Sequence, residues 1–559
     1  MNRNMNRNRD MNRNRDMTMS RNMTMGRNMS GNMSRNMKMN RIMTINIDGK
    51  KIWAEGSVYG KLSVLIGLLI LAPAALLPWY PQEAYFAPAF LLPGGACVLL
   101  GVLEDLWSRL REEAVPDEGS RQGRYGLIVL FAWGLGIVAG AVPFVLGGQL
   151  RVIPALFEAV SGWTTTGLST MDVSKVPKIF LFHRSLMQYC GGLGFILMML
   201  LFISGRQSAG LYSAEGHPDK IMPNIKRTAR AIFAVYMVCL LLGTAAYRIA
   251  GMPWFDGLCH SMCSLSTGGF STRLMSIGEY NSLPVEIITV VLMLIGTTNF
   301  AALLVLARGG IREFFRISEV RFMLLLFALL IPPVALSLVR SMPIGLLESL
   351  RQSAFNVASA LSTTGYSTAN YADWPPFAVG MLIVVMLIGG GIGSTAGGLK
   401  LSRVYLLLRL CLQHVRDMLS PEQTVRSARY TKASGKTPID RELADETRGF
   451  ASAYFLIFLI GSLALTVTAD CSLTEAMFDF ASALGTVGLS IGITGPATGN
   501  ATLLVEMVGM ILGRLEIFIV IIGVAFGVGR IRAFMAGVGR CRSRHIPRSC
   551  RFGNERPSC

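Results

Sequence analysis

Four short stretches decide the fold of this chain: SGWTTTGLST at 161–170, CSLSTGGFST at 263–272, SALSTTGYST at 359–368 and SALGTVGLSI at 482–491. They align without gaps, and each has a threonine two residues before a shared glycine and a serine two residues after it. The shared glycines are Gly167, Gly269, Gly365 and Gly488. Since they recur roughly every hundred residues, the repeat is a structural unit rather than a local motif.

Apolar runs surround each stretch in the same order. A long run precedes each glycine, at about 125–148, 230–251, 320–339 and 450–469. Another long run follows, at about 181–204, 284–307, 377–399 and 502–528. The segment that leads into each glycine has about a dozen residues, too short to span a bilayer. The predicted unit is therefore a helix, a short re-entrant helix, an extended loop and a second helix, and two further runs at about 62–80 and 86–103 predict an extra hairpin in front.

Composition places these runs in a membrane. The 559 residues are 52% hydrophobic and only 16% charged, whereas a soluble domain carries about 25% charged residues. We therefore predict an all-α polytopic membrane protein with four pseudo-symmetric helix/pore-loop/helix units around one ion pore. The expected divisions are a low-complexity basic extension (1–54), the extra transmembrane hairpin (55–115), pore units 1 (120–205), 2 (226–308) and 3 (318–403), a cytoplasmic linker (404–448), pore unit 4 (449–530) and a basic tail (531–559).

The net charge of +19 lies largely in the two ends and in the connections between units. No nucleic-acid-reading motif accompanies it, whereas basic loops are typical of the cytoplasmic side of a membrane protein. All four pore loops are then expected to enter from outside. The extension repeats MNRNRD at 5–10 and 11–16, so we expect it to be disordered, or translated from upstream of a true start at Met43; a basic arm on anionic lipid is the alternative. The ten cysteines show no metal or disulfide pattern.

Glycine and threonine in four such loops suit the binding of a dehydrated monovalent cation. Non-helical backbone at membrane depth must be buried in protein or line water. Glycine permits the backbone angles that turn carbonyls toward an axis, and rings of carbonyls replace a hydration shell. Close helix packing on small residues is the alternative. The expected potassium-binding filter residues are Thr165, Thr166, Gly167, Thr267, Gly268, Gly269, Thr363, Thr364, Gly365, Thr486, Val487 and Gly488.

The loops and their surroundings resemble the Trk/Ktr/HKT superfamily of potassium transporters, most closely the bacterial Trk-type potassium-uptake membrane subunit. The resemblance covers about 55–530. It rests on the four loops, on His183-Arg184-Ser185 before Gly191-Gly192-Leu193-Gly194, on the glycine-rich stretch after the third loop, and on Gly513-Arg514-Leu515-Glu516. Two positions depart from the pattern: Gly268 stands where the other loops have threonine or valine, and Cys259 replaces a phenylalanine.

The resemblance implies a pseudo-tetrameric potassium pore within one chain, found as a homodimer in the inner membrane of a bacterium. A cytoplasmic nucleotide-binding regulatory subunit is the implied partner, potassium the substrate, and no cofactor or other metal is implied. In that family a serine at the first filter glycine accompanies sodium permeation, so Gly167 implies potassium. His183, Arg184 and Asn299 are expected to be packing or interface residues rather than ion ligands.

A glycine-rich loop at 389–398 lies where the second helix of unit 3 should cross the membrane. Because each glycine costs about 1 kcal/mol in a helix, the helix should break there. The resemblance implies that this loop is a gate below the filter; close packing is the alternative, and the phosphate-loop pattern is not met. The expected gate residues are Gly389, Gly390, Gly391, Gly393, Ser394, Thr395, Gly397 and Gly398.

Arg514 lies in the middle of the last apolar run, where a charge is costly and usually functional. The resemblance places it beneath the filter, where its positive charge would repel a cation by roughly 2 kcal/mol at about 8 Å. A buried pair with Glu506 or Glu516 is the alternative.

Two other functions compete with a potassium pore. A secondary transporter of another monovalent cation or a small solute would also use broken helices, but its inverted repeats should enter from opposite faces. An enzyme is not expected, because no cluster of His, Cys and carboxylate residues shares a site.

Overall fold

The computed structural model describes residues 57–110, 121–194, 225–419, 429–433 and 435–542. The predictions for the extension at 1–54, and for the tail beyond residue 542, lie outside the described residues.

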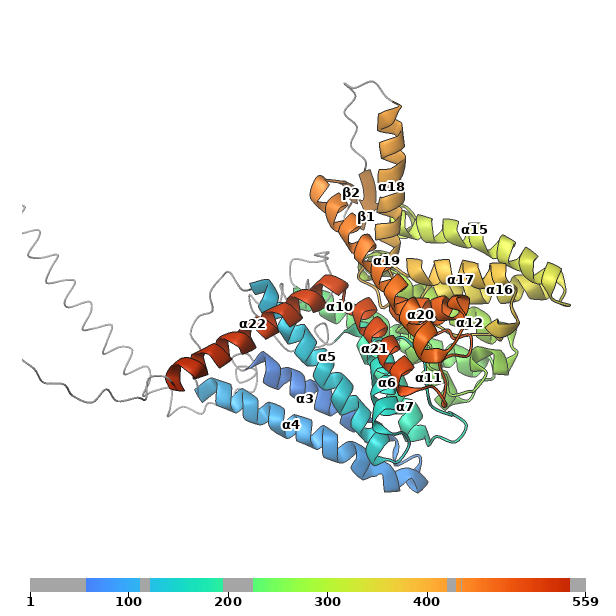
Figure 1. Ribbon diagram of the computed structural model, residues 1–559. Helices are drawn as coiled ribbons and strands as arrows, with labels where there is room; N and C mark the ends of the chain where they lie inside the picture. Colours follow the sequence, from blue (N-terminus) through green and yellow to red (C-terminus); the bar gives the residue numbers. More distant parts are fainter. Residues whose placement is uncertain (1–56, 111–120, 195–224, 420–428, 434, 543–559) are drawn as a thin grey trace, which may run out of the picture. The chain divides into compact units, whose positions relative to one another are not determined.

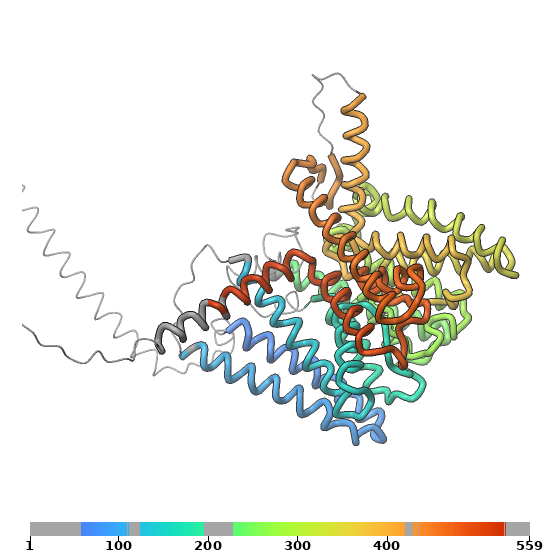
Figure 2. The backbone as a smooth tube through the Cα atoms, viewed as in Figure 1, coloured from blue at the N-terminus to red at the C-terminus, as the bar shows by residue number. Residues whose placement is uncertain are grey.

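Two helices near the start form a hairpin. They are α3 (Val58–Leu71) and α4 (Ala87–Leu110), joined through the short 3-10 helices η1 (Ala72–Leu76) and η2 (Pro81–Phe86). Figures 1 and 2 show α3 and α4 side by side. A Cβ atom on Gly67 would lie 2.7 Å from the carbonyl oxygen of Gly94. Glycine therefore lets the two backbones approach closely, as is common between helices in membranes.

After the hairpin the same order of elements occurs four times, and we number these units 1 to 4. The long first helices are α5 (Arg121–Leu146), α10 (Ile225–Ile249), α15 (Ser318–Ser341) and α19 (Arg441–Ala469). The short helices are α6 (Val152–Trp163), α11 (Trp254–Leu265), α16 (Leu346–Leu361) and α20 (Leu473–Gly485). After an extended segment come the second helices, α7 (Lys178–Leu193), α12 (Leu283–Thr297), α17 (Pro376–Ile388) and α21 (Asn500–Arg514). The extended segments of units 2 and 3 also contain the 3-10 helices η4 (Ser276–Tyr280) and η5 (Tyr371–Asp373).

The second helices of units 2, 3 and 4 are broken. In unit 3 the helix stops at Ile388, and α18 (Leu401–Met418) begins only after the glycine-rich loop, as its glycine content predicts. In unit 2 the chain bends by 113° into α13 (Phe300–Ala307), and in unit 4 by 104° before α22 (Ile517–Arg542). The apolar runs at 284–307 and 502–528 suggested continuous helices, and this was wrong. Asn299 caps a new helix in unit 2, and Glu516 takes a left-handed backbone angle in unit 4.

Within the described ranges, six helices are long and apolar enough to cross a membrane, or up to eight if each bent pair counts as one span. The short α6 and the broken α17 fall below that length. In a membrane the backbone N–H and C=O groups must form their hydrogen bonds within the segment, and this explains why such apolar segments are helical. The starts of several helices are fixed locally: α20, for example, begins with a capping box between Ser472 and Glu475.

The polar connection between units 3 and 4 is structured along most of its described length. Helix α18 continues to Met418, and a two-stranded antiparallel sheet follows, made of β1 (Arg429–Lys432) and β2 (Gly435–Pro438). Arg429 pairs with Pro438 in its register. The short α14 (Ile311–Phe314) lies before the first helix of unit 3. The backbone amide of Thr431 donates to the Ser318 hydroxyl at 2.9 Å, so the sheet is tied to the start of α15.

Two large clusters of buried apolar side chains form the core. One joins the hairpin mainly with units 1 and 2, where it includes Phe157, Trp163 and Phe180, and it also takes in some residues of units 3 and 4. The other joins units 3 and 4 and includes Tyr454 and Phe478. The short helices therefore lie at the centre of the fold, and each one delivers its Thr-x-Gly loop there.

Candidate functional site

The four Thr-x-Gly loops, which are the segments ending at Gly167, Gly269, Gly365 and Gly488, share one backbone geometry. Their first threonines have φ angles of 57°, 52°, 56° and 51°, a region that L-residues rarely adopt. The residue after each threonine donates its amide to the carbonyl five residues earlier, at distances between 2.8 and 3.0 Å. All four glycines also have positive φ. The four loops that share a sequence pattern therefore also share a backbone conformation.

These loops form a closed ring. A Cβ atom on Gly167 would strike the carbonyl oxygen of Gly268 in unit 2. The same construction on Gly269 strikes Thr364 of unit 3, that on Gly365 strikes Val487 of unit 4, and that on Gly488 returns to Thr166 of unit 1. Each glycine therefore lies against the backbone of the next unit, in the order 1, 2, 3, 4, 1. Only glycine leaves room for this approach.

The threonine and valine side chains of the predicted filter are buried. All of Thr165, Thr166, Thr267, Thr363, Thr364, Thr486 and Val487 have an exposed fraction of 0%. The structure brings all twelve predicted filter residues together in this ring, because they belong to the four loops that meet there.

The departure at Gly268 has a structural cause. Gln188, on α7 of unit 1, donates its side-chain amide to the Gly268 carbonyl at 2.5 Å and accepts from the Phe270 amide at 3.0 Å. A Cβ atom on Gly268 would overlap the Gln188 side chain. Glycine at position 268 therefore leaves room for the Gln188 side chain, which connects unit 1 to the second loop. Sequence reasoning missed Gln188, since nothing in the linear pattern links it to the second loop.

A set of four polar side chains, one in each unit, was also missed. Nine residues before each shared glycine stand Glu158, His260, Asn356 and Asp479, all buried on the short helices. Each bonds to the segment just after its own loop: Glu158 to Ser169, His260 to Ser271, Asn356 to Thr368 and Asp479 to Ser490. The common offset was the signal, but the residue types differ. We call these four residues the clamp residues.

In unit 1 the clamp residue is neutralised by a buried cation. The Nε of Arg184 lies 2.5 Å from Glu158 Oε1, and both side chains are almost completely buried. The guanidinium also stacks over the Phe270 ring of unit 2, with its carbon 4.0 Å from the ring centroid. Its neighbour His183 contacts the Gly140 carbonyl through Nε2 at 3.0 Å. Both side chains make contacts that join helices and loops.

The glycine-rich loop (389–398) lies directly against the ring. The Thr395 hydroxyl is 3.0 Å from the Thr267 hydroxyl, and the Gly397 amide donates to the Thr363 hydroxyl at 3.0 Å. A Cβ atom on Gly397 would overlap the hydroxyl of Thr486. Three of the four units therefore contact this loop through the threonine that begins their Thr-x-Gly segment.

Charged side chains hold the same loop from other directions. Glu319 accepts the Ile392 amide at 2.8 Å, and Lys400 donates to the Ala396 carbonyl. Arg514 donates to the Thr395 carbonyl, and also to the carbonyls of Gly191 at 2.7 Å and Gly192 at 3.2 Å. Arg514 thus links the glycine-rich loop to the end of α7 in unit 1. Its sequence neighbour Glu516 is ion-paired with Arg403 at 2.8 Å.

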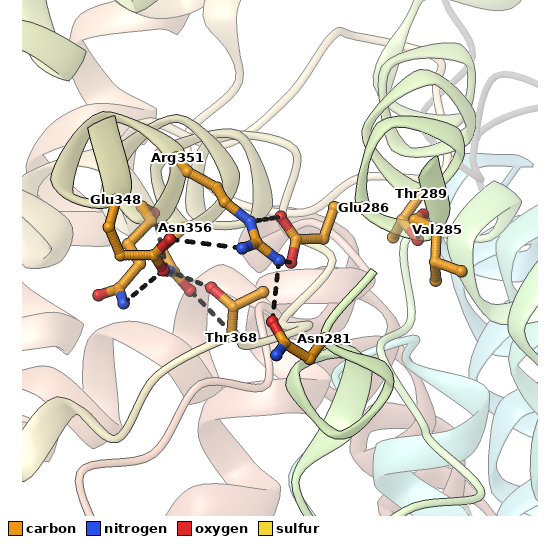
Figure 3. A network of polar contacts seen from close by, with 9 residues as sticks. Asn281, Val285, Glu286, Thr289, Glu348, Arg351, Asn356 and Thr368 are labelled. Atoms are coloured by element: carbon orange, nitrogen blue, oxygen red, sulfur yellow. Dashed lines mark hydrogen bonds and ion pairs between the residues drawn. The ribbon is translucent and has the colours of Figure 1, made fainter. Parts of the chain in front are cut away.

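A further polar network joins units 2 and 3 on the outer side of the short helix α16. Figure 3 shows Arg351 reaching Glu286 on α12 and Asn281 in the preceding segment. The Arg351 to Glu286 distance is 2.7 Å, and the glutamate is only 5% exposed. One turn along α16, the clamp residue Asn356 holds Thr368. The helix that carries the third loop is therefore anchored to its neighbour.

Comparison with known proteins agrees with this architecture. The family model TrkH, described as a cation transport protein, matches residues 124–527. The Trk system potassium uptake protein TrkH of Halomonas elongata is 31% identical over 489 residues, covering 83% of this chain and 96% of that protein. TrkG of Escherichia coli K12, also named a Trk system potassium uptake protein, is 31% identical with the same coverage.

A solved structure shows the same fold. The crystal structure of the potassium transporter TrkH from Vibrio parahaemolyticus matches with a TM-score of 0.72 at 27% sequence identity, covering 85% of this chain and 98% of that chain. The family match spans all four units, and the structural match extends over most of the chain. This chain, with its four Thr-x-Gly loops in one ring, belongs to the TrkH family of cation transport proteins.

Proposed function

We propose that this chain is the membrane subunit of a potassium uptake system, in which the four Thr-x-Gly loops are the selectivity filter. The closed ring of glycine contacts carries the proposal, because it brings four equivalent loops around one axis. The names of the relatives from Halomonas elongata and Escherichia coli support potassium as the substrate. The proposed activity is transport rather than catalysis, with no resident cofactor.

The chemistry follows from the backbone. Neutral carbonyl dipoles can replace the hydration shell of a monovalent cation, and they bind the cation weakly enough for it to leave again. Left-handed threonines and glycines turn a helical chain into the extended form that exposes successive carbonyls. The hydrogen bonds at the base of each loop and the clamp residues at its outer end keep that form in place.

The glycine-rich loop is proposed as the gate. Arg514 is proposed as its latch, which means that its hydrogen bond to Thr395 holds the gate closed. Its contacts with Thr267 and Thr363 support a position immediately below the filter, where it would block an ion's path. Arg514 would keep the loop seated by bonding to Thr395, and its charge would repel a cation below the filter. Movement of the loop would require these bonds to break together.

We further propose that the protein lies in the inner membrane of a bacterium with its pore loops facing outside, as a homodimer with a cytoplasmic nucleotide-binding regulatory subunit. The orientation is supported by basic residues in the connection between units 2 and 3, which is at the opposite end of α12 and α15 from the loops. Arg308, Arg312 and Arg316 lie in that connection, and Arg321 lies in the first turn of α15. The Trk-system names of the relatives support a partner subunit.

The test is growth in limiting potassium of an uptake-deficient bacterium that expresses the full chain, together with its own regulatory subunit, with rubidium and sodium uptake recorded. Gly167→Ser should weaken the preference for potassium, because the new side chain would strike the Gly268 carbonyl. Gly148→Ser is the matched control: that glycine also has positive φ, but nothing lies within 4 Å of its Cβ position. Failure of the parent to rescue growth, with the protein well expressed, would favour transport of another solute.

A further inference from the structure

The clamp residue of unit 4 has a different partner from that of unit 1. In unit 1 the seventh residue of the second helix is Arg184, which neutralises Glu158. The seventh residue of α21 in unit 4 is Glu506. Its carboxyl group and that of the clamp residue Asp479 both contact the Thr494 hydroxyl. Both carboxyl groups have an exposed fraction of 0%. A pair of acids therefore occupies the position that holds an ion pair in unit 1.

The part of the chain that the structure describes places no cation in an ion pair with either acid. Among the described residues, none of the ion pairs includes Asp479 or Glu506. Burying one unpaired carboxylate is costly, and burying two in contact with one hydroxyl is more costly still. Two carboxyl groups in such a place do not both remain ionised, so one of them holds a proton.

The hydrogen-bond donors around each carboxyl group identify which one is ionised. Asp479 accepts from the Ser490 hydroxyl at 2.7 Å, from the Ile491 amide at 2.9 Å and from the Thr494 amide at 3.3 Å. An anion is stabilised by such donors. Among the residues that the structure describes, Glu506 contacts only the Thr494 hydroxyl through Oε1, at 2.7 Å, and its buried Oε2 has no hydrogen-bond partner there. Asp479 is therefore the anion, and Glu506 the acid.

The Thr494 hydroxyl explains how the proton is used. This hydroxyl lies 2.7 Å from Glu506 and 3.3 Å from Asp479, but it has a single proton to donate. If Glu506 is a neutral acid, its O–H donates to the Thr494 oxygen, and the Thr494 O–H then donates to Asp479. The arrangement satisfies both contacts, at 2.7 and 3.3 Å, without a second hydroxyl proton.

We propose that Glu506 is a proton-binding site, and that its proton completes a relay through Thr494 to Asp479 that positions the outer end of the fourth Thr-x-Gly loop. Asp479 holds Ser490 and Ile491, which lie two and three residues after Gly488 in the chain. Glu506 acts on the loop through Thr494 and Asp479, so it is a positioning residue. Its effect on uptake rests on the proposed filter function, but its protonation does not.

Infrared difference spectroscopy of the full chain in lipid tests the protonation directly. At neutral pH, Glu506→Gln should remove a band of a protonated carboxylic acid from the parent spectrum and leave the carboxylate bands unchanged. Glu475→Gln is the matched control, since Glu475 caps α20 by accepting from Ser472 and should contribute a carboxylate band instead. If Glu506→Gln removes only a carboxylate band, the proposal is wrong, whatever the protein transports.

Rubidium uptake tests the positioning role. Glu506→Gln retains a donor for Thr494, so uptake should stay within about twofold of the parent. Glu506→Leu has no donor and should lower uptake roughly tenfold, equivalent to about 1.4 kcal/mol. Thr494→Val breaks the relay from its middle, and should lower uptake similarly if Glu506→Leu fails to fold. Parental uptake by a folded Glu506→Leu or Thr494→Val variant would overturn the positioning role.

Discussion

Replacing Arg514 with alanine should raise ion flux. The guanidinium donates to one carbonyl of the glycine-rich loop, at Thr395, and to two carbonyls at the end of α7, at Gly191 and Gly192. A hydrogen bond from a charged donor contributes about 1.5 to 3 kcal/mol. Since 1.4 kcal/mol is a factor of ten in population, loss of the Thr395 bond alone should favour the displaced loop by roughly 10- to 100-fold.

Two further variants separate the latch from the charge. Arg514→Lys keeps the charge but cannot bond carbonyls on both sides with one planar group. Arg514→Gln removes the charge but keeps a donor for Thr395. If the latch dominates, the lysine variant should approach the alanine variant in flux and the glutamine variant should stay nearer the parent. If repulsion of the cation dominates, the order should be reversed.

The measurement is rubidium uptake into vesicles that contain equal amounts of folded protein. The increase in flux has an upper limit, because the fraction of molecules with a displaced loop cannot exceed one. The initial rate of uptake is therefore the quantity to compare. Uptake by Arg514→Ala equal to that of the parent would refute both the latch and the charge barrier.

Other substitutions test neighbouring contacts. Gly365→Ala should abolish uptake, because its Cβ would strike the Val487 carbonyl at a positive φ, whereas Gly380→Ala in open space on α17 should leave uptake unchanged; comparable uptake by both variants would contradict the ring. Thr395→Val keeps the volume but removes bonds to Thr267 and to the Gly296 carbonyl, so flux should rise, and an unchanged initial rate would argue against a gate at this loop. Arg351→Ala leaves Glu286 buried without its ion pair and should lower stability by up to about 3 kcal/mol in thermal unfolding. Arg448→Ala, which removes an exposed pair, should cost under about 1 kcal/mol, and an equal loss in both would contradict the role of burial.

Local features of the fold could be predicted from the sequence. The four stretches around the shared glycines, the short helices before them and the break at 389–398 all follow from residue types and apolar lengths. Glycine, for example, weakens a helix wherever it stands, so its effect can be read without knowing the neighbours. The bends after Thr297 and Arg514 could not be read in this way, because apolar composition continues across them and reports burial rather than backbone direction.

Contacts between the units could not be predicted from patterns along the sequence. Gln188 matters because α7 lies beside the second loop, a fact that depends on the order of the units around the ring. The clamp residues were concealed for another reason. Their positions match, but Glu158, His260, Asn356 and Asp479 differ in charge and shape, so an alignment by residue type does not reveal them. Each satisfies the same loop with a different chemistry.

The closed ring has a consequence for how the protein is made. Unit 1 needs unit 4 as its neighbour, and the contact from Arg514 to Gly191 joins residues 323 positions apart in the chain. At about 5 to 20 residues per second, a ribosome takes tens of seconds to cover that distance. During this interval the first loop has been synthesised without the neighbour that completes it. The ring of glycine contacts can therefore close only after unit 4 has been synthesised and inserted, and the selective path proposed above cannot form before that point.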